Sequence, residues 1–359
     1  MRPKTIHDIS FDDLAAWLTE QGQPRFRAEQ IWQWLWIKGA TSFEDMTNVS
    51  KSLRSALSQV FPIALPTVAE VHTSADGTRK FLLNLHDGHV LETVLIPGGE
   101  HFTQCLSTQV GCNLGCTFCS TGQMGLTRNL SAAEIAGQVI VARNHLWQTG
   151  TGMRLRNLVF MGMGEPLLNW ENVDNALDRL IHASAMNFSP RRVTVSTVGV
   201  PGTLDALGHS HKASLAVSLH APNQELREKI MPRAARMLPL PDLLARLRSY
   251  PMAPRQRVTI EYVLLGGVND SLDQARQLVR CLNGIRCKVN LIAFNPCPGL
   301  PYSAPETEQV LAFETLLRDK GLTATLRKSK GQDISAACGQ LKTRRTAGAN
   351  NCGPTVTNT

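Results

Sequence analysis

The sequence of 359 residues lacks any uninterrupted apolar stretch of the roughly 20 residues that a membrane helix needs. Its opening segment, MRPKTIHDISFDDLAAWL, also lacks the apolar core of a secretory signal peptide. These two absences argue against a membrane protein and against an exported protein, so we expect a cytoplasmic protein with no membrane partner. Because 43% of the residues are hydrophobic, the chain can bury one large core and a smaller appended unit.

Acidic residues are in deficit, since 29 Asp and Glu stand against 37 Lys and Arg, which gives a formal net charge of +8. A basic surface suits a polyanionic partner such as nucleic acid, but an ordinary basic enzyme explains so modest an excess equally well. Nine cysteines in a chain without an export signal argue against a disulfide framework and favour metal binding or thiol chemistry.

The first 60 residues and the next 38 differ in pattern. Apolar residues recur at helical spacing over residues 11–57, which predicts a small helical unit. The unit carries five basic residues and three tryptophans. Either these side chains bind RNA, or the tryptophans form the core and the basic residues lie on solvated faces. They are Arg25, Arg27, Lys38, Lys51, Arg54, Trp32, Trp34 and Trp36. Three β-like runs over residues 68–73, 80–85 and 90–96 follow two prolines. We expect a helical RNA-binding-type domain at 1–60 and a β-rich extension at 61–98.

Beyond residue 98, strand-like runs alternate with helical segments, which predicts parallel strands in an α/β fold. The runs cover residues 105–110, 157–161, 192–197, 214–219, 257–263 and 288–292. Capping boxes at Ser131 and Ser271 mark two helix starts. Six units predict a partial (β/α)6 barrel, similar to a TIM barrel but open, over residues 99–345, followed by a polar tail at 346–359. The carboxyl ends of its strands would face the site.

Three cysteines after the first run form a C-x3-C-x2-C pattern at Cys112, Cys116 and Cys119. Three thiolates on one loop can bind three irons of a [4Fe–4S] cluster, and Gly111 and Gly115 let the loop turn tightly. The fourth iron would remain open to S-adenosylmethionine (SAM), whose reductive cleavage yields a 5′-deoxyadenosyl radical. A structural zinc site or chance cysteines are the alternatives. His101 is a conceivable fourth zinc ligand, but its spacing matches no common zinc motif.

Other polar residues follow the remaining runs, where barrel loops meet a ligand. A glycine-rich turn ends in Gly164 and Glu165, whose carboxylate could accept hydrogen bonds from the SAM ammonium group, or it could be an ordinary strand–helix turn. Five further positions either contact the ligand or have a purely structural role. They are Ser196, Ser218, Leu219, His220 and Asn295. Two more thiols stand out, Cys105 and Cys338. Core or loop positions account for Cys281, Cys287 and Cys297, and a polar tail holds Cys352.

Taken together, these residues and motifs resemble the RlmN/Cfr family of radical SAM RNA methyltransferases, and within it the RlmN branch. The resemblance covers nearly the whole chain in the family's order. It includes the helical N-terminal unit and the segments CLSTQVGCNLGCTFCSTGQMGLTRNL, FMGMGEPLLN, VTVSTVGVP, VSLHAPN, VTIEYVLLGGVND, NLIAFNP and GQDISAACGQL.

The resemblance implies methylation of adenosine C2 in 23S rRNA at the peptidyl-transferase centre and in tRNA beside the anticodon. It implies that Cys338 takes a methyl group from one SAM, and that a radical from a second SAM activates this group to add to C2. It also implies that Cys105 resolves the RNA adduct by forming a disulfide with Cys338, and that Glu92 accepts the C2 proton.

By the same resemblance, SAM contacts fall to Gly164, Glu165, Ser196, Ser218 through His220, and Asn295. We expect an external one-electron reductant of the flavodoxin type and a monomeric enzyme. Two other functions stay open: a Cfr-like enzyme that methylates adenosine C8, and a zinc-bearing RNA-binding protein. The target adenosine must be extruded or single-stranded, because C2 is unreachable inside a stacked helix.

Overall fold

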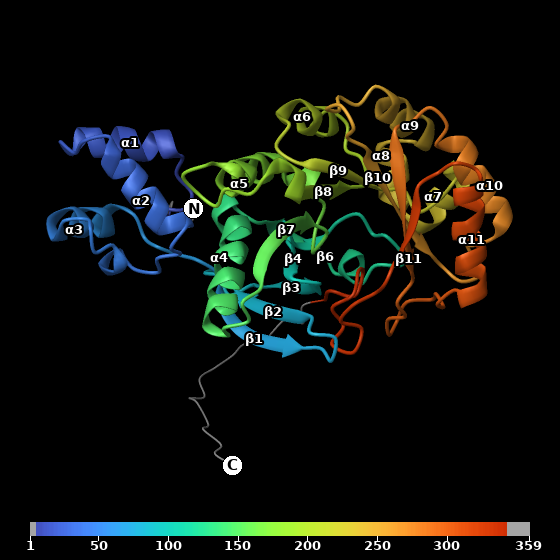
Figure 1. Ribbon diagram of the computed structural model, residues 1–359, viewed down its shortest axis with the longest axis horizontal. Coiled ribbons are helices and arrows are strands. Elements are labelled where there is room, and N and C mark those ends of the chain that lie inside the picture. Colours follow the sequence, from blue (N-terminus) through green and yellow to red (C-terminus); the bar gives the residue numbers. More distant parts are fainter. Residues whose placement is uncertain (1–4, 343–359) are drawn as a thin grey trace, which may run out of the picture.

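The computed structural model describes residues 5–342 and begins with a helical unit (Figure 1). This unit contains α1 (Phe11–Glu20), α2 (Phe26–Trp36), the 3-10 helix η1 (Phe43–Asp45) and α3 (Lys51–Val60). Ser10 begins α1 with a capping box. Trp32 and Trp36 are buried in its core, and Arg54 pairs with Glu44 at 2.8 Å. The core interpretation therefore holds for these two tryptophans, and Arg54 has a structural partner.

One open sheet of ten strands forms the centre of the molecule. Its first part is antiparallel: β1 (Thr67–Thr73), β2 (Arg79–Asn84), β3 (Val90–Gly98) and β4 (His101–Cys105). The parallel part continues in spatial order from β4 through β7 (Arg154–Phe160), β8 (Val193–Thr197), β9 (Ser214–Ser218), β10 (Val258–Leu264), β11 (Cys287–Ala293) and β12 (Ala324–Arg327). The predicted α/β barrel with a β extension is confirmed.

Most predicted runs agree with the observed strands to within three residues, but the first run of the barrel was predicted wrongly and one strand was not predicted. The run predicted over residues 105–110 shares only Cys105 with the sheet strand β4, which precedes it. Its last two residues belong to a separate hairpin of β5 (Gln109–Cys112) and β6 (Gly125–Asn129). The parallel part also has a further edge strand, β12, which is only four residues long. The cysteine pattern therefore begins on a hairpin that leaves the main sheet.

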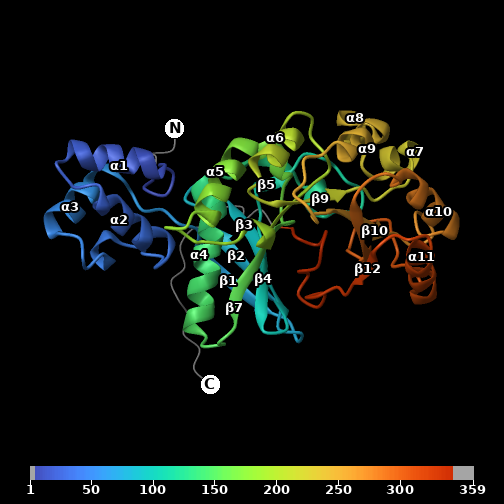
Figure 2. The same cartoon turned by 45° about the horizontal axis from the view of Figure 1, so that its top comes forward.

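Helices cover the outer side of the parallel strands (Figure 2). They are α4 (Ala132–Gln148), α5 (Trp170–Ile181), α6 (Thr203–Ser210), α7 (Gln224–Ile230), α8 (Pro232–Met237), α9 (Leu240–Arg248), α10 (Leu272–Cys281) and α11 (Thr307–Asp319). Short 3-10 helices lie between them: η2 (Thr121–Gln123), η3 (Pro166–Asn169) and η4 (Pro190–Arg192). The predicted capping boxes at Ser131 and Ser271 begin α4 and α10.

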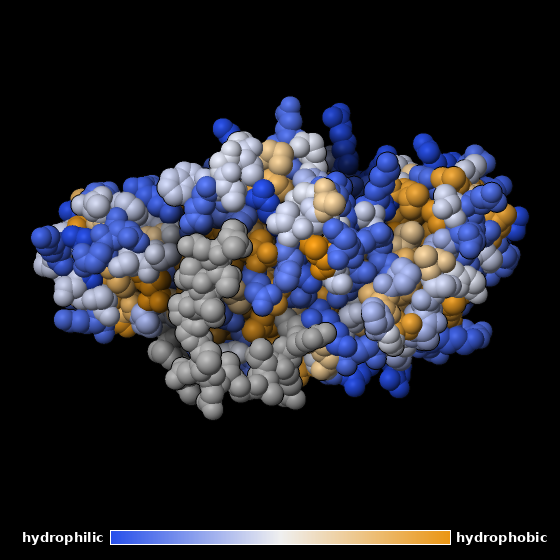
Figure 3. All heavy atoms as spheres, turned by 90° about the horizontal axis from the view of Figure 1, so that it is seen from below, coloured by the Kyte–Doolittle hydropathy of each residue, from blue (hydrophilic) through white to orange (hydrophobic). Residues whose placement is uncertain are grey.

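The face seen in Figure 3 is mostly hydrophilic. On the face in Figure 3, outside the part that grey atoms cover, hydrophobic residues form separated groups among hydrophilic ones. Within residues 5–342, no helix is long and apolar enough to cross a membrane. The predicted polar tail and Cys352 lie outside the described residues.

Candidate active site

The cysteine loop, residues 112–119, lies between the strands of the β5–β6 hairpin. Cys112 ends β5, and Cys116 and Cys119 follow on the turn beyond it. Gly111 has a φ of +78°, and a Cβ added there would collide with the carbonyl group of Gly125 on the opposite strand. The position directly before Cys112 therefore requires glycine, in agreement with the tight turn that the glycines predicted.

Hydrogen bonds attach the loop to two distant parts of the chain. The Thr117 amide donates to the Ile230 carbonyl at 3.0 Å. On the other side, the Ser120 amide donates to the Gly339 carbonyl at 2.8 Å, and Thr121 Oγ1 donates to the Leu341 carbonyl at 2.6 Å. The loop is thus fastened directly to the segment that carries Cys338.

The three thiols fit a cluster better than a single ion. Burial raises the pKa of Cys112 to about 11 and raises those of Cys116 and Cys119, so a ligand that stabilises thiolates is needed to ionise them. Over residues 5–342, no three His, Cys, Asp or Glu side chains converge as ligands of one metal ion. Thiolates that bind separate irons of a cluster need no such convergence. His101 begins β4 and does not line the cavity beside the cysteines, so it is not placed to complete a zinc site.

One cavity unites the cysteine loop with the ends of the parallel strands. All three cysteines line it together with Cys338. Six of the residues predicted to contact SAM line the same cavity, namely Gly164, Glu165, Ser196, Ser218, His220 and Asn295. Leu219 does not line it, because its side chain packs in the main hydrophobic core. The strand ends therefore bring together residues that are more than 170 positions apart in the chain, since Cys112 and Asn295 share this cavity.

Glu165 is held rigidly at the end of the turn after β7. Its Oε1 accepts from the Leu167 amide and its Oε2 accepts from the Val198 amide, both at 3.0 Å. A Cβ at Gly164 would come within 2.5 Å of the Gln109 side chain, so the turn needs glycine beside Glu165. Burial raises the Glu165 pKa, and an ammonium group in the cavity would favour the ionised form. Each carboxylate oxygen keeps acceptor capacity for such a cation.

His220 is a neutral, buried side chain. Burial lowers its pKa to about 3, and its Nδ1 accepts from the Val263 amide at 3.1 Å, which leaves Nε2 as the protonated nitrogen. Its ring meets Phe118 edge to face at 5.1 Å, so it supports the cysteine loop. Asn295 Oδ1 accepts from Gln332 Nε2 of the Cys338 segment. These residues therefore connect the cavity wall to both thiol-bearing loops.

A second cavity lies against the first and contains both predicted redox thiols. Cys105, Cys119 and Cys338 line it, and Cys338 and Cys119 also line the first cavity. Cys105 ends β4, is buried, and has a pKa that burial raises to about 12. Cys338 is exposed, and both side chains are free thiols. Cys338 is therefore the more accessible of the two thiols, whereas burial favours the protonated form of Cys105.

The β extension carries the Cys338 segment, residues 331–342. The Gly331 amide donates to Asp76 Oδ2 at 2.9 Å, and the Ala75 amide donates to Asp333 Oδ2 at 3.1 Å. Burial alone would raise the Asp76 pKa, but hydrogen bonds from Thr78 and Gly331 lower it to about 2. The turn between β1 and β2 is thus a platform that holds this segment over the barrel.

Glu92 lies on β3 under the same segment rather than on a cavity wall. Its Oε2 accepts from the Lys342 amide at 2.8 Å, and its Oε1 lies 3.3 Å from Lys80 Nζ. It is 3% exposed and lines neither cavity. Release of the Lys342 contact would be needed before this carboxylate could reach a substrate.

Four charged residues that line the two cavities were not predicted, and two of them, Lys328 and Lys330, line the second cavity beside Arg327. Arg327 ends β12 and lines the second cavity, where its electrostatic partners include Cys338, Glu261 and Cys105. Glu261, in the middle of β10, lines the first cavity, and its Oε2 is buried with no hydrogen-bond partner among the described residues. A charged residue at the carboxyl end of a barrel strand is a candidate site residue, and this rule could have identified Arg327. The sequence pattern does not reveal β12, however, so the rule could not be applied.

Comparison with known proteins places these features in one group. A family model for the ribosomal RNA large subunit methyltransferase N-terminal domain matches residues 5–63, and one for the radical SAM superfamily matches residues 106–279. The dual-specificity RNA methyltransferase RlmN of Nitratidesulfovibrio vulgaris (strain DSM 19637 / Miyazaki F) is 58% identical over 344 residues, covering 94% of each chain. That of Oleidesulfovibrio alaskensis is 53% identical, covering 97% of this chain and 98% of its own.

A solved structure agrees with this grouping. A radical SAM methyltransferase from Sphaerobacter thermophilus superposes with a TM-score of 0.90 at 43% identity, covering 95% of this chain and 99% of that one. The match extends over the helical unit, the β extension and the barrel together, since it leaves so little of either chain unmatched.

Proposed function

The chain belongs to the RlmN family of dual-specificity RNA methyltransferases, and from this premise we propose which residues carry its reaction. It is a SAM-dependent RNA methyltransferase with a radical SAM barrel, and the superfamily implies one [4Fe–4S] cluster and SAM. The proposed product is 2-methyladenosine in 23S rRNA and in tRNA, made in the cytoplasm where both RNAs occur.

The observation that carries the proposal is the sharing of cavities. The cysteine loop, the SAM candidates and Cys338 line one cavity, and Cys105 lies with Cys338 in the cavity beside it. Cys112, Cys116 and Cys119 would hold the cluster. When bound, the cluster supplies the electron that cleaves SAM reductively and so starts radical chemistry.

The binding residues would hold SAM in the cavity that the cysteine loop and Cys338 also line. Glu165 accepts hydrogen bonds from the SAM ammonium group, because its carboxylate is fixed by two backbone amides on the cavity wall. Ser196, Ser218 and Asn295 provide hydroxyl and amide groups for hydrogen bonds to the remaining polar atoms of SAM. His220 lines the same cavity with an uncharged imidazole ring. Leu219 is the exception among the predicted contacts, because it does not line this cavity and its side chain packs in the main core.

Cys338 carries the methyl group to the RNA. Its thiolate attacks the SAM methyl carbon, a new C–S bond forms, and the SAM sulfur leaves with the electron pair. The half-buried guanidinium of Arg327 lines the cavity that holds Cys338, and Cys338 is its foremost electrostatic partner. The S-methyl group of Cys338 would then give up a hydrogen atom to the 5′-deoxyadenosyl group released by reductive cleavage of the second SAM, and its carbon would bond to C2 of adenosine. One SAM donates the methyl group and a second is cleaved, so two are consumed with one external electron donor.

Release of the product uses the second thiol. Glu92 would accept the C2 proton after the Lys342 contact opens, and the unpaired electron of the adduct would return to the cluster, which restores the aromatic ring. The Cys105 thiol gives up its proton, and its sulfur bonds to the Cys338 sulfur as the bond between Cys338 and the new methyl carbon breaks; that carbon takes up the released proton. One chain supplies every group in this sequence, and we therefore infer a monomeric enzyme.

Nucleoside mass spectrometry tests the proposal. RNA treated with the cluster-loaded enzyme, SAM and a reductant should contain 2-methyladenosine, and Cys338→Ala should abolish it. Finding 8-methyladenosine instead would assign the Cfr-like reaction. Stoichiometric zinc without iron in the purified protein, together with unmodified RNA, would replace the enzyme with a zinc-bearing RNA-binding protein.

A further inference from the structure

The amino ends of the parallel strands lie at the opposite end of the barrel from the two cavities. Six connections lead from a helix back to a strand at this end, over residues 149–153, 182–192, 211–213, 249–257, 282–286 and 320–323. None of them contains Asp or Glu. Cations occur in most of them or just inside the next strand: Arg154, Arg156, Arg191, Arg192, Lys212, Arg255, Arg257, Arg286, Lys288 and Lys320. Positive charge is therefore concentrated at this end.

Two hollows adjoin each other there. The first is lined by Trp147, Phe188 and several arginines, including Arg156 and Arg192. The second is lined by the connections before β8, β9 and β10. The two meet within residues 189–192, because Ser189 and Arg192 line the first while Pro190 and Arg191 line the second. We call the combined surface the basic rim, defined by Arg154, Arg156, Arg191, Arg192 and Arg255.

The arginines of the basic rim are not explained by structural roles. Over residues 5–342 none of the five forms an ion pair, and all five are exposed. Arg192 makes one long contact, 3.4 Å to Asn157 Oδ1. Cations stabilise a helix dipole from the last helical turn, but these arginines lie in loops, in η4 or on strands. Their guanidinium groups are free to bind phosphate in pairs of hydrogen bonds.

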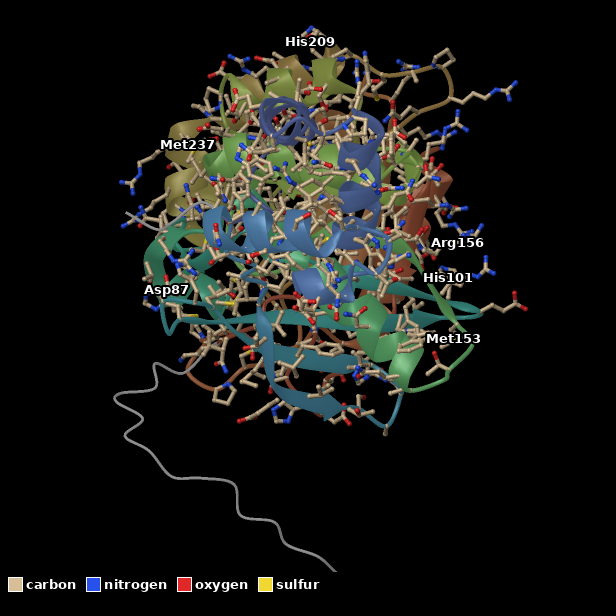
Figure 4. All side chains as sticks on the ribbon, turned by 90° about the vertical axis from the view of Figure 1, so that its left-hand side faces the viewer. Asp87, His101, Met153, Arg156, His209 and Met237 are labelled. Atoms are coloured by element: carbon tan, nitrogen blue, oxygen red, sulfur yellow. The ribbon has the colours of Figure 1, made fainter. Side chains whose placement is uncertain are left out.

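Trp147 stands beside these arginines on the last turn of α4. It is 84% exposed, although a large aromatic side chain normally buries most of its surface. An exposed ring next to cations is the combination that binds a nucleic acid, because the ring stacks on a base while the cations hold the backbone. Figure 4 shows Met153 and Arg156 along one side of the molecule.

The first hollow also borders the helical unit. Arg143, which lines this hollow, donates to the carbonyl groups of Trp36 and Ile37 at the end of α2, at 3.2 and 3.1 Å. A chain bound along the basic rim could therefore continue onto the N-terminal unit, where Lys38 lies over the Trp34 ring at 3.5 Å.

We propose that the basic rim is a second RNA-binding surface, which holds the sugar-phosphate backbone of a long substrate RNA outside the target hairpin, with Trp147 stacking on an unpaired base. The proposal rests on the proposed function for the RNA class. The basic rim takes no part in the chemistry, because both cavities lie at the other end of the strands.

The test compares two RNAs and matched variants of the cluster-loaded enzyme. The RNAs are a transcript of a complete 23S rRNA domain that contains the target adenosine, and a short hairpin that contains the same adenosine. Arg156→Gln/Arg192→Gln removes two charges from the basic rim. Arg276→Gln/Arg318→Gln removes two charges from the outer helices α10 and α11 and is the control.

Filter binding at several salt concentrations should separate the variants. Each lost phosphate contact lowers the slope of log affinity against log salt by about 0.7–0.9, so the rim variant should lose about 1.5 in slope and about ten-fold in affinity for the long transcript. Trp147→Ala should weaken binding about five-fold or more without changing the slope. The rim variant and Trp147→Ala should both bind and methylate the short hairpin as the parent enzyme does.

Equal weakening on both RNAs, or the same effect in the control variant, would overturn the proposal. So would unchanged binding of the long transcript. Failure of the proposed function would look different, because the parent enzyme would then methylate neither RNA while the binding comparison could still be made.

Discussion

Gly111 offers a direct test of how the hairpin positions the cysteine loop. Its φ of +78° costs an alanine roughly 1–2 kcal/mol, and the added Cβ would collide with the Gly125 carbonyl group across the β5–β6 ladder. Relief of such a backbone clash adds about 1–3 kcal/mol. Gly111→Ala should therefore lower the free energy of unfolding by about 2–5 kcal/mol and move Cys112 away from the other thiols.

Gly115 provides the matched control inside the same loop. Its φ is +65°, but a Cβ there would meet nothing within 4 Å. Gly115→Ala should cost only the conformational part, about 1–2 kcal/mol, and should keep the cluster. Urea denaturation gives the stability, and iron content with visible absorbance after anaerobic reconstitution gives the cluster. Full iron content in the Gly111 variant, or equal loss in both, would refute the positioning role of Gly111.

Three further predictions concern thiols. Arg327→Gln should slow alkylation of Cys338 by the anionic reagent iodoacetate about ten-fold more than alkylation by neutral iodoacetamide, whereas Arg327→Lys should keep most of both rates, because a cation in the cavity attracts the anionic reagent; equal slowing by both reagents would contradict this role of Arg327. Cys105→Ala should trap a covalent protein–RNA adduct, seen by mass spectrometry after nuclease digestion, and free product without an adduct would contradict the resolving role. Burial raises the Cys281 pKa to about 12, so above about pH 9 the unfolded chain loses a proton that the folded chain keeps. The free energy of unfolding should then fall as pH rises, less steeply in Cys281→Ala, and identical slopes would refute the shift.

The parts of the site that lie at strand ends could be predicted. A parallel sheet brings the carboxyl ends of its strands to one edge, so the order of strand-like runs along the chain is enough to group Glu165, Ser196 and Asn295. The cysteine spacing needs no tertiary information, because all three thiols lie on one short loop. The main sheet follows from the alternation of strand-like and helical runs.

The remaining features depend on contacts that sequence distance does not reveal. Asp76 and Gly331 meet across 255 positions, and no local pattern indicates that the β1–β2 turn carries the Cys338 segment. Strand β12 has four residues, too few to show a period, so Arg327 at its end was missed. Glu261 was hidden because a carboxylate in the middle of a strand has no recognisable motif. The division of the first run at Cys105 reflects a hairpin that hydrophobicity alone does not separate.

The central claim is that Cys338 carries the methyl group. Cluster-loaded enzyme incubated with SAM labelled in its methyl group should yield a peptide with one labelled methyl on Cys338. When RNA and a reductant are then added, we expect this same label to be transferred to adenosine C2. Methylated RNA whose label comes only from fresh SAM, while the label on Cys338 persists, would contradict the claim.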